Sequence, residues 1–161
     1  RMVEIALEIA QPQPGEKILD AFCGVGLFAL AFARAGAQVT GIEANARAID
    51  DAQWNATHNC LAARFVAGDV ARTLRREKRV RFEVALLDPP RAGAASAIEE
   101  IAGRGPRRVI YVSCDPATLA RDVRSFAREG YELRRAVPLD LFPQTAHVET
   151  IACLERKGAP M

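Results

Sequence analysis

In "KILDAFCGVGLFALAFARAGAQVTGIE", residues 17–43, two short apolar runs enclose a glycine-containing loop and a segment with helical spacing. The runs at 17–22 and 38–43 are near-continuous in hydrophobicity, which is typical of parallel strands covered on both faces. Between them, the apolar residues of 26–35 recur at the spacing of a helix. This unit predicts two parallel strands joined by a right-handed helical crossover.

The same alternation continues along the rest of the chain. Further strands, also expected to be covered on both faces, are predicted at 63–68, 82–88 and 107–113, and further helices at 45–59, 70–78, 95–103 and 116–129. After Gly130 two strand-like segments follow with only a loop between them, which predicts an antiparallel pair. We therefore expect an α/β protein with a doubly wound, Rossmann-like fold. Its sheet should have seven strands, mostly parallel, with an antiparallel C-terminal pair.

Length and composition are those of one globular domain. The chain has 161 residues, 50% of them hydrophobic and 26% charged, so we expect a single domain over residues 1–161. Because Arg1 begins within a segment that already has helical spacing, we interpret the sequence as a piece of a longer protein. No apolar run approaches the roughly 18 residues of a membrane span, and no secretory leader is seen, so we expect a cytoplasmic protein.

The cysteines and the basic residues are two further kinds of candidate site. Cys23, Cys60, Cys114 and Cys153 lie far apart and neither histidine has zinc-ligand spacing, which predicts free thiols and no metal site. Basic runs occur between Arg72 and Arg81 and between Arg104 and Arg108. Such runs are ordinarily solvated faces, but they are also compatible with a phosphate-rich partner.

A glycine loop follows the first predicted strand, at the sheet edge where open parallel sheets bind ligands. Gly24, Gly26 and Ala29 fit the pattern G-x-G-x-x-[GA], in which the glycines let a ligand approach the backbone closely. Glu43 ends the next strand, where a carboxylate can accept hydrogen bonds from both hydroxyls of a ribose. Together these residues indicate an adenosine-type ligand.

The loop alone fits either a nicotinamide dinucleotide or S-adenosylmethionine. Asp69, after the third strand, can hold the exocyclic amine of adenine, and Asp88, after the fourth, lies where the methionine ammonium of S-adenosylmethionine would sit. A dinucleotide has no use for these two carboxylates, which favours S-adenosylmethionine. Plainer roles stay open: Asp69 also suits the N-cap of a helix beginning at Val70, and Asp88 a turn before Pro-Pro.

The stretch "DPPRAG", residues 88–93, predicts a rigid wall beside the ligand. Pro89 and Pro90 fix an extended backbone against which a flat substrate can lie. Amine methyltransferases with a comparable stretch carry an aromatic residue after the prolines, whereas this sequence has Arg91, which disfavours methylation of an exocyclic amine. Pro89 and Arg91 are therefore candidate substrate-binding residues, although Arg91 suits an ordinary surface position equally well.

"YVSCDP", residues 111–116, brings Cys114 to the end of a strand just before a helix that starts at Pro116, capped by Ser113 or Asp115. The plain alternative is a small buried residue. A nucleophilic thiol beside a methyl donor indicates methylation at carbon, because addition of a thiolate to carbon 6 of uracil activates carbon 5. A base must then remove the carbon 5 proton. Glu149 is the candidate, with His147 on the same strand face, unless it is an ordinary strand carboxylate.

Four motifs in this order resemble the catalytic domain of the S-adenosylmethionine-dependent RNA uracil-5-methyltransferase family. They are "FCGVG" (22–26), "DPPRAG" (88–93), "VSCDPATLARD" (112–122) and "FPQTAHVE" (142–149). The resemblance implies a class I methyltransferase fold, with Cys114 as the nucleophile and Glu149 as the base. It also implies a cofactor site lined by Phe22, Gly24, Gly26, Glu43, Asp69 and Asp88. Leu27 departs from the family, many members of which carry a polar residue there.

The resemblance also bears on partners. The long match "VSCDPATLARD" is more similar to the 23S ribosomal RNA branch than to the transfer RNA branch. Family members usually carry an amino-terminal RNA-binding barrel and a central insert, and some hold an iron–sulfur cluster in that part. We therefore expect RNA, specifically 23S rRNA, as the partner of a monomer, with no metal in this piece.

Alternatives from other classes remain. A transfer RNA 5-methyluridine methyltransferase would use the same residues. A cytosine-5 methyltransferase would carry a cysteine beside the proline of 88–93, and a nicotinamide dehydrogenase would leave Cys114 and Glu149 without a role. A non-catalytic RNA-binding module that keeps a cofactor pocket is the alternative outside enzymes.

Overall fold

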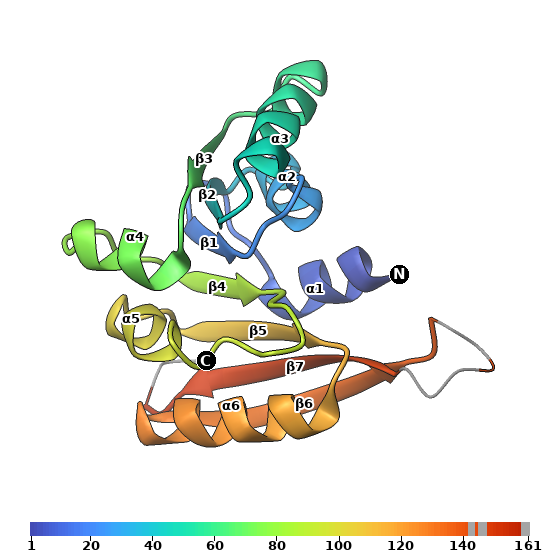
Figure 1. The fold of residues 1–161 in the computed structure, drawn as a ribbon, viewed down its shortest axis with the longest axis vertical. Coiled ribbons are helices and arrows are strands. Elements are labelled where there is room, and N and C mark those ends of the chain that lie inside the picture. The colour runs from blue at the N-terminus through green and yellow to red at the C-terminus, as the bar shows by residue number, and fades with distance from the viewer. Residues whose placement is uncertain (142–143, 145–147, 159–161) are drawn as a thin grey trace.

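The computed structural model describes residues 1–141, 144 and 148–158. Within them the helices are α1 (Met2–Ala10), α2 (Leu27–Arg34), α3 (Ala46–His58), α4 (Val70–Arg76), α5 (Ile98–Gly103) and α6 (Pro116–Arg128). The strands are β1 (Lys17–Ala21), β2 (Gln38–Glu43), β3 (Ala63–Ala67), β4 (Val84–Leu87), β5 (Arg108–Ser113), β6 (Tyr131–Leu139) and β7 (Glu149–Arg156). Helices and strands alternate as far as β6, after which β7 follows without a helix (Figure 1).

The strands form one seven-stranded sheet in the order β3-β2-β1-β4-β5-β7-β6. The first five strands in sequence pair in parallel, and β7 pairs antiparallel with both β5 and β6. This arrangement confirms the α/β, doubly wound fold and its antiparallel C-terminal pair. From β1 the sheet grows outward to β2 and β3 on one side and to β4 and β5 on the other. The ends of β1 and β4 therefore flank the switch point where such sheets bind ligands.

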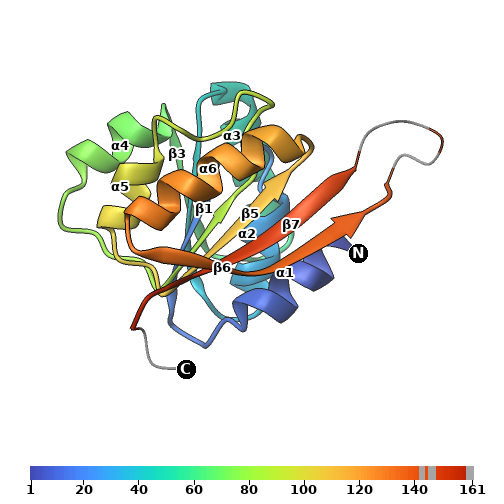
Figure 2. The ribbon, with the colours of Figure 1, turned by 90° about the horizontal axis from the view of Figure 1, so that it is seen from below.

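Hydrophobic clusters lie on both faces of the sheet. One contains side chains of α4, α5 and α6, such as Leu74, Ile101 and Phe126, and the other contains side chains of α1 and α2, such as Ile9 and Phe32. Figure 2 shows α5 and α6 on one face and α1 on the other. Fully burying one such side chain contributes about 1.5–3 kcal/mol, so this two-sided packing holds the central strands rigidly.

The burial of β3, the strand at one edge of the sheet, differs from the sequence prediction. β3 was expected to be covered on both faces, but none of its residues is fully buried. The expectation is wrong because β3 is the outer strand: among the described strands it has a hydrogen-bonded neighbour, β2, along one edge only, and its other edge is open. The central strands β1 and β4 do have the near-continuous burial that was predicted.

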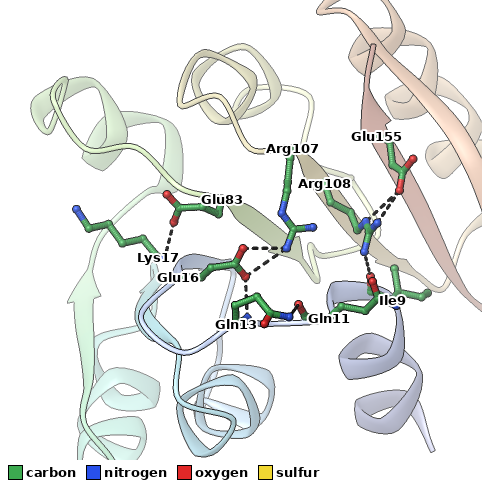
Figure 3. Close-up of polar contacts among 9 residues, drawn as sticks. All are labelled: Ile9, Gln11, Gln13, Glu16, Lys17, Glu83, Arg107, Arg108 and Glu155. Atoms are coloured by element: carbon green, nitrogen blue, oxygen red, sulfur yellow. Dashed lines mark hydrogen bonds and ion pairs between the residues drawn. The ribbon is translucent and has the colours of Figure 1, made fainter. Parts of the chain in front are cut away.

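Ion pairs and hydrogen bonds fix the amino-terminal side of the sheet (Figure 3). Arg107 Nη2 donates to both carboxylate oxygens of Glu16, at 3.0 and 3.2 Å. Arg108 Nη2 donates to Glu155 Oε1 at 2.7 Å, and Arg108 also donates to the carbonyl of Ile9 at the end of α1. These contacts tie α1 and the loop after it to β5 and β7. The site is expected at the opposite edge of the sheet, outside the carboxyl ends of the parallel strands.

Among the described residues, no helix has both the length and the apolar character required to cross a membrane.

Candidate active site

The strand register brings the predicted site residues to one edge of the sheet. Ala21 pairs with both Ile42 and Leu87, so the glycine loop, Glu43 and Asp88 all follow directly at neighbouring strand ends. At the other end of this row, Ser113 of β5 pairs with Thr150 of β7. Cys114 directly follows Ser113 and Glu149 directly precedes Thr150, so both residues adjoin the last pair of this antiparallel ladder.

The glycine loop turns sharply between β1 and α2. The amides of Phe22 and Cys23 both donate to the carbonyl of Ile42, at 2.8 and 3.1 Å. Phe22 has a φ of 64°, a left-handed conformation that costs a non-glycine residue about 1–3 kcal/mol. Gly26 has a φ of 88°, and a Cβ there would lie 3.2 Å from the ring of Phe65. The loop is thus held in one strained shape close to the sheet, as a backbone cradle for a ligand requires.

Glu43 is bound to this loop through its carboxylate. Oε2 accepts from the amide of Gly24 at 3.3 Å, and Oε1 accepts from the amide of Asn45 at 2.8 Å. Each carboxylate oxygen can accept a second hydrogen bond. Since Glu43 is only half-buried, the two hydroxyls of a ribose could still bind to it.

Asp69 has the plainer role that the sequence left open. It is the N-cap of α4, where its Oδ1 accepts from the amide of Arg72 at 2.8 Å. Its side chain is exposed, and the carbonyl of Glu43 accepts from the adjacent Gly68 amide at 2.8 Å. Asp69 therefore lies beside Glu43, and its second carboxylate oxygen is compatible with a ligand amine.

Asp88 follows β4 beside the glycine loop. Its amide donates to the carbonyl of Ala21 at 3.3 Å, which fixes the backbone next to Phe22. Asp88 as a whole residue is exposed. Partial burial of its carboxyl group, and then the charge of Glu149, raise the pKa of Asp88 to about 6. Asp88 is therefore within the electrostatic reach of Glu149. Two neighbouring carboxylates form a site that favours a cation.

Sequence reasoning gave no role to Asp20, one strand position before Ala21. Its side chain is fully buried, Oδ2 accepts from the amide of Ala29 at 2.8 Å, and Oδ1 has no partner among the described residues. Burial, with smaller contributions from Asp88 and Glu43, raises its pKa to about 8. An acidic residue within the apolar run of 17–22 was the signal that could have identified it.

Cys114 lies at the junction of β5 and α6 and is half-buried. Asp115, not Ser113, caps α6: the Thr118 amide donates to Asp115 Oδ1 at 2.6 Å and lowers the pKa of that carboxyl group. The hydroxyl of Ser113 instead donates to the carbonyl of Asp115 at 3.0 Å. Cys114 consequently lies on a hydrogen-bonded turn at the amino terminus of a 13-residue helix.

Glu149 is the first residue of β7, where it pairs with Leu139 of β6 and is half-buried. His147 lies outside the described residues, as does most of the stretch 142–149. In the substrate wall, Pro89 is half-buried and Arg91 is exposed. Three residues without a predicted role lie in a hydrogen-bonded group behind this wall: Arg121 donates to the carbonyl of Ala92, and Asp122 accepts from Tyr111 and from the amide of Ala94.

Other cavities lie away from this edge. A groove of about 850 Å³ runs beside β2, β3 and α3, and none of the candidate site residues lines it. Within the part of the chain that the structure describes, no group of three or more His, Cys, Asp or Glu side chains could hold a metal ion.

Comparison with known proteins adds a family. Residues 1–157 match the family model described as tRNA (Uracil-5-)-methyltransferase. A 23S rRNA (uracil(1939)-C(5))-methyltransferase RlmD of Acidithiobacillus ferrooxidans is 48% identical over 160 residues, 96% of this chain and 36% of the relative. The RlmD of Pseudomonas aeruginosa PAO1 is 47% identical over 157 residues, 96% of this chain and 35% of the relative. The chain thus spans about a third of the length of these curated relatives.

Solved structures agree with the fold. The Pyrococcus abyssi tRNA (uracil-54, C5)-methyltransferase, in complex with S-adenosyl-L-homocysteine, aligns with a TM-score of 0.78 and 34% identity. The alignment covers 94% of this chain and 37% of that one. TrmN of Thermus thermophilus also aligns with a TM-score of 0.78, at 24% identity, over 96% of this chain and 48% of TrmN, which supports the fold alone.

Proposed function

This chain belongs to the tRNA (uracil-5-)-methyltransferase family, and on that premise we propose that it transfers a methyl group from S-adenosylmethionine to carbon 5 of a uridine in RNA. The observation that carries the proposal is the pairing of Ser113 with Thr150 between β5 and β7, which supports a close approach of the adjoining residues Cys114 and Glu149. Asp88 and the glycine loop lie at the same edge. A nucleophile, a base and a cation-binding carboxylate are the groups that this reaction needs.

The cofactor site consists of Phe22, Gly24, Gly26, Glu43, Asp69 and Asp88. Glu43 binds the ribose hydroxyls, Asp69 the adenine amine, and Asp88 the methionine ammonium, whose positive charge offsets the repulsion between Asp88 and Glu149. Bound S-adenosylmethionine supplies an electrophilic methyl group. The complex of the Pyrococcus abyssi relative with S-adenosyl-L-homocysteine, the demethylated cofactor, supports this assignment.

Cys114 activates the uracil ring. Its thiolate forms a bond to carbon 6, and the electrons of the carbon 5–carbon 6 double bond move to give an enolate that is nucleophilic at carbon 5. Carbon 5 then forms a bond to the methyl carbon while the bond from that carbon to the sulfonium sulfur breaks, which leaves S-adenosyl-L-homocysteine. The amino terminus of α6 favours negative charge on the attacking sulfur. Pro89 and Arg91 hold the base and its phosphate at the edge of the wall.

Glu149 completes the reaction as the general base. Its carboxylate removes the proton from carbon 5, the double bond re-forms, and the bond from carbon 6 to Cys114 Sγ breaks, which returns the free thiolate. Their positions beside the same ladder pair support this division of roles, because nucleophile and base must both reach one ring.

We propose 23S rRNA as the substrate, at the uridine equivalent to position 1939, because the relatives at 47% and 48% identity are named for that nucleotide. Action as a monomer, in the cytoplasm and without a metal in this chain belongs to the same proposal. A transfer RNA substrate is the second candidate, supported by the Pyrococcus abyssi enzyme at 34% identity.

The test uses the protein with methyl-labelled S-adenosylmethionine and two RNAs from cells that lack its gene, 23S rRNA and total transfer RNA. Mass mapping of nuclease fragments should find the label on carbon 5 of one uridine in 23S rRNA. Label in transfer RNA alone would replace the substrate but keep the chemistry. Label on cytosine, or on an exocyclic nitrogen, would overturn the proposed function.

A further inference from the structure

A buried carboxylate joins the segment after β4 to α6. Asp122 is fully buried, and its Oδ2 accepts from the hydroxyl of Tyr111 at 2.6 Å and from the amide of Ala94 at 2.7 Å. Its Oδ1 accepts from Arg121 Nε at 2.9 Å. These contacts join strand β5 and helix α6, which follow each other in sequence, to the earlier loop that begins with Asp88.

Further contacts tie the same loop to the same helix. Arg121 Nη2 donates to the carbonyl of Ala92 at 2.8 Å, and the Thr118 hydroxyl donates to the carbonyl of Arg91 at 3.2 Å. Gly93 has a φ of 82°, and a Cβ there would lie 2.5 Å from Thr118 Cγ2 and 2.6 Å from Asp122 Oδ2. The loop backbone therefore lies directly against α6, where only a glycine fits.

The loop and the helix that these hydrogen bonds join both carry residues of the proposed reaction. The loop carries Asp88, Pro89 and Arg91, whereas α6 begins two residues after Cys114 and is capped by Asp115. A shift of the loop along α6 would change the distance between the wall and the thiol. Thr118 contributes to both structures, because its amide binds Asp115 and its hydroxyl binds the Arg91 carbonyl.

We propose that Asp122 is a positioning residue, which fixes the Asp88–Arg91 wall relative to Cys114 so that the bound base meets the thiol in a reactive geometry. This inference rests on the proposed function. A charge in the core is costly unless it is fully hydrogen-bonded, and here each of its oxygens accepts from at least one donor. Burial, and then the bond to Asp122, raise the pKa of the Tyr111 hydroxyl, which keeps it protonated as a donor.

Asp122→Asn is the informative substitution because it keeps the shape and changes the hydrogen bonds. If the amide oxygen stays with Tyr111 and Ala94, the amide nitrogen faces the guanidinium of Arg121, and two donors meet. If the amide is turned, its nitrogen faces the Ala94 amide, and the loop loses the oxygen that accepts its hydrogen bond. Arg121→Met removes the second tie, to Ala92, from an exposed position. Arg124→Met is the matched control, since Arg124 is exposed on α6 and has no ion pair among the described residues.

The variants are made in the full chain and assayed below their unfolding midpoints, with saturating S-adenosylmethionine. Single-turnover methyl transfer by Asp122→Asn should fall about 10²-fold, the loss expected for a misplaced reacting group. The half-saturating RNA concentration and the calorimetric affinity for S-adenosylmethionine should not change. Hydrogen exchange at the Ala94 amide should become faster. Arg121→Met should show a smaller loss of the same kind, and Arg124→Met none.

The outcomes are separable from those of the proposed function. If the wild type methylates no uridine, the proposed function fails. If the wild type is active and Asp122→Asn transfers methyl at the wild-type rate, the positioning role is overturned. A loss of affinity for S-adenosylmethionine or RNA that accounts for the lower activity also overturns it. Should Asp122→Asn not fold, Tyr111→Phe, which removes one donor only, must show the slower transfer with unchanged half-saturation, and wild-type transfer would again refute the inference.

Discussion

Ser113 pairs with Thr150 in the antiparallel ladder between β5 and β7. Cys114 directly follows Ser113 and Glu149 directly precedes Thr150, so two residues 35 positions apart in the numbering adjoin the same ladder pair. The antiparallel pair at the end of the sheet thus has a chemical consequence. In a sheet that was parallel throughout, a strand in the place of β7 would bring its last residue, not its first, to this edge.

Replacement of the thiol tests the first step. Cys114→Ala should abolish methyl transfer and leave the affinity for S-adenosylmethionine unchanged, because Cys114 has no hydrogen bond to the glycine loop among the described residues. Transfer is measured with labelled cofactor, and binding by calorimetry. Cys60→Ala is the matched control, an exposed cysteine at the end of α3. Lost cofactor affinity in Cys114→Ala would mean that the cysteine is structural.

Replacement of the base should stop the reaction after methyl transfer. Glu149→Gln cannot remove the carbon 5 proton, so we expect a covalent RNA–protein adduct that survives denaturation and appears as a shifted band on a gel. Glu99→Gln, on the exposed side of α5, should give no such band. RNA with 5-fluorouridine should trap the wild type in the same way. Normal turnover by Glu149→Gln would assign the base to another residue.

The sequence predicted the order of elements because hydrophobic periodicity reports whether a segment is buried as a strand or as a helix. It also offered Asp69 as a possible N-cap and left Ser113 or Asp115 as the cap of α6, since short polar side chains before a helix bind its free amides locally; the structure has Asp69 and Asp115 as the caps. The prediction that β3 is buried on both faces was wrong because strand order depends on pairing between distant segments. Nothing within 63–68 shows that one edge of this strand has no neighbouring strand in the described part of the chain.

The sequence predicted those site residues that strand ends and motifs can identify. Asp88, Cys114 and Glu149 converge because the carboxyl ends of parallel strands share one edge and β7 starts there. Asp122 was missed because its partners Tyr111 and Ala94 are 11 and 28 positions away, beyond any periodicity. The roles of Cys114 and Glu149 remain predictions for the experiments above.

Loss of the Asp88 charge should weaken cofactor binding. A hydrogen bond to a charged group is worth about 1.5–3 kcal/mol, so Asp88→Asn should reduce the affinity for S-adenosylmethionine by roughly 10- to 100-fold. With a pKa of about 6 for Asp88, wild-type affinity should also fall as the pH drops through that value, because protonation removes the charge that binds the ammonium. Calorimetry over a pH series measures both effects.

Two variants control this result. Glu149→Gln removes the neighbouring charge that raises the pKa of Asp88, so the fall in affinity should move to lower pH. Asp51→Asn, on the exposed face of α3, should bind like the wild type. An affinity that does not depend on pH in the wild type, or that is unchanged in Asp88→Asn, would refute an ammonium site at Asp88.

Asp20 should make the protein less stable as the pH rises. Burial raises its pKa from an ordinary value of 3.8 to about 8 in the folded chain, so between these values the folded state holds more protons than the unfolded state. The free energy of unfolding therefore falls as the pH increases through this window, by up to about 1.4 kcal/mol per pH unit from this group, and levels off above it.

Asp20→Asn isolates this contribution. The amide oxygen can still accept from the Ala29 amide, and the side chain does not titrate, so urea denaturation over the same pH range should give a smaller slope of unfolding free energy against pH than the wild type. Asp50→Asn, exposed on α3, should keep the wild-type slope. Equal slopes in the wild type and Asp20→Asn would mean that Asp20 is ionised in the folded state, with its charge stabilised by a partner for Oδ1.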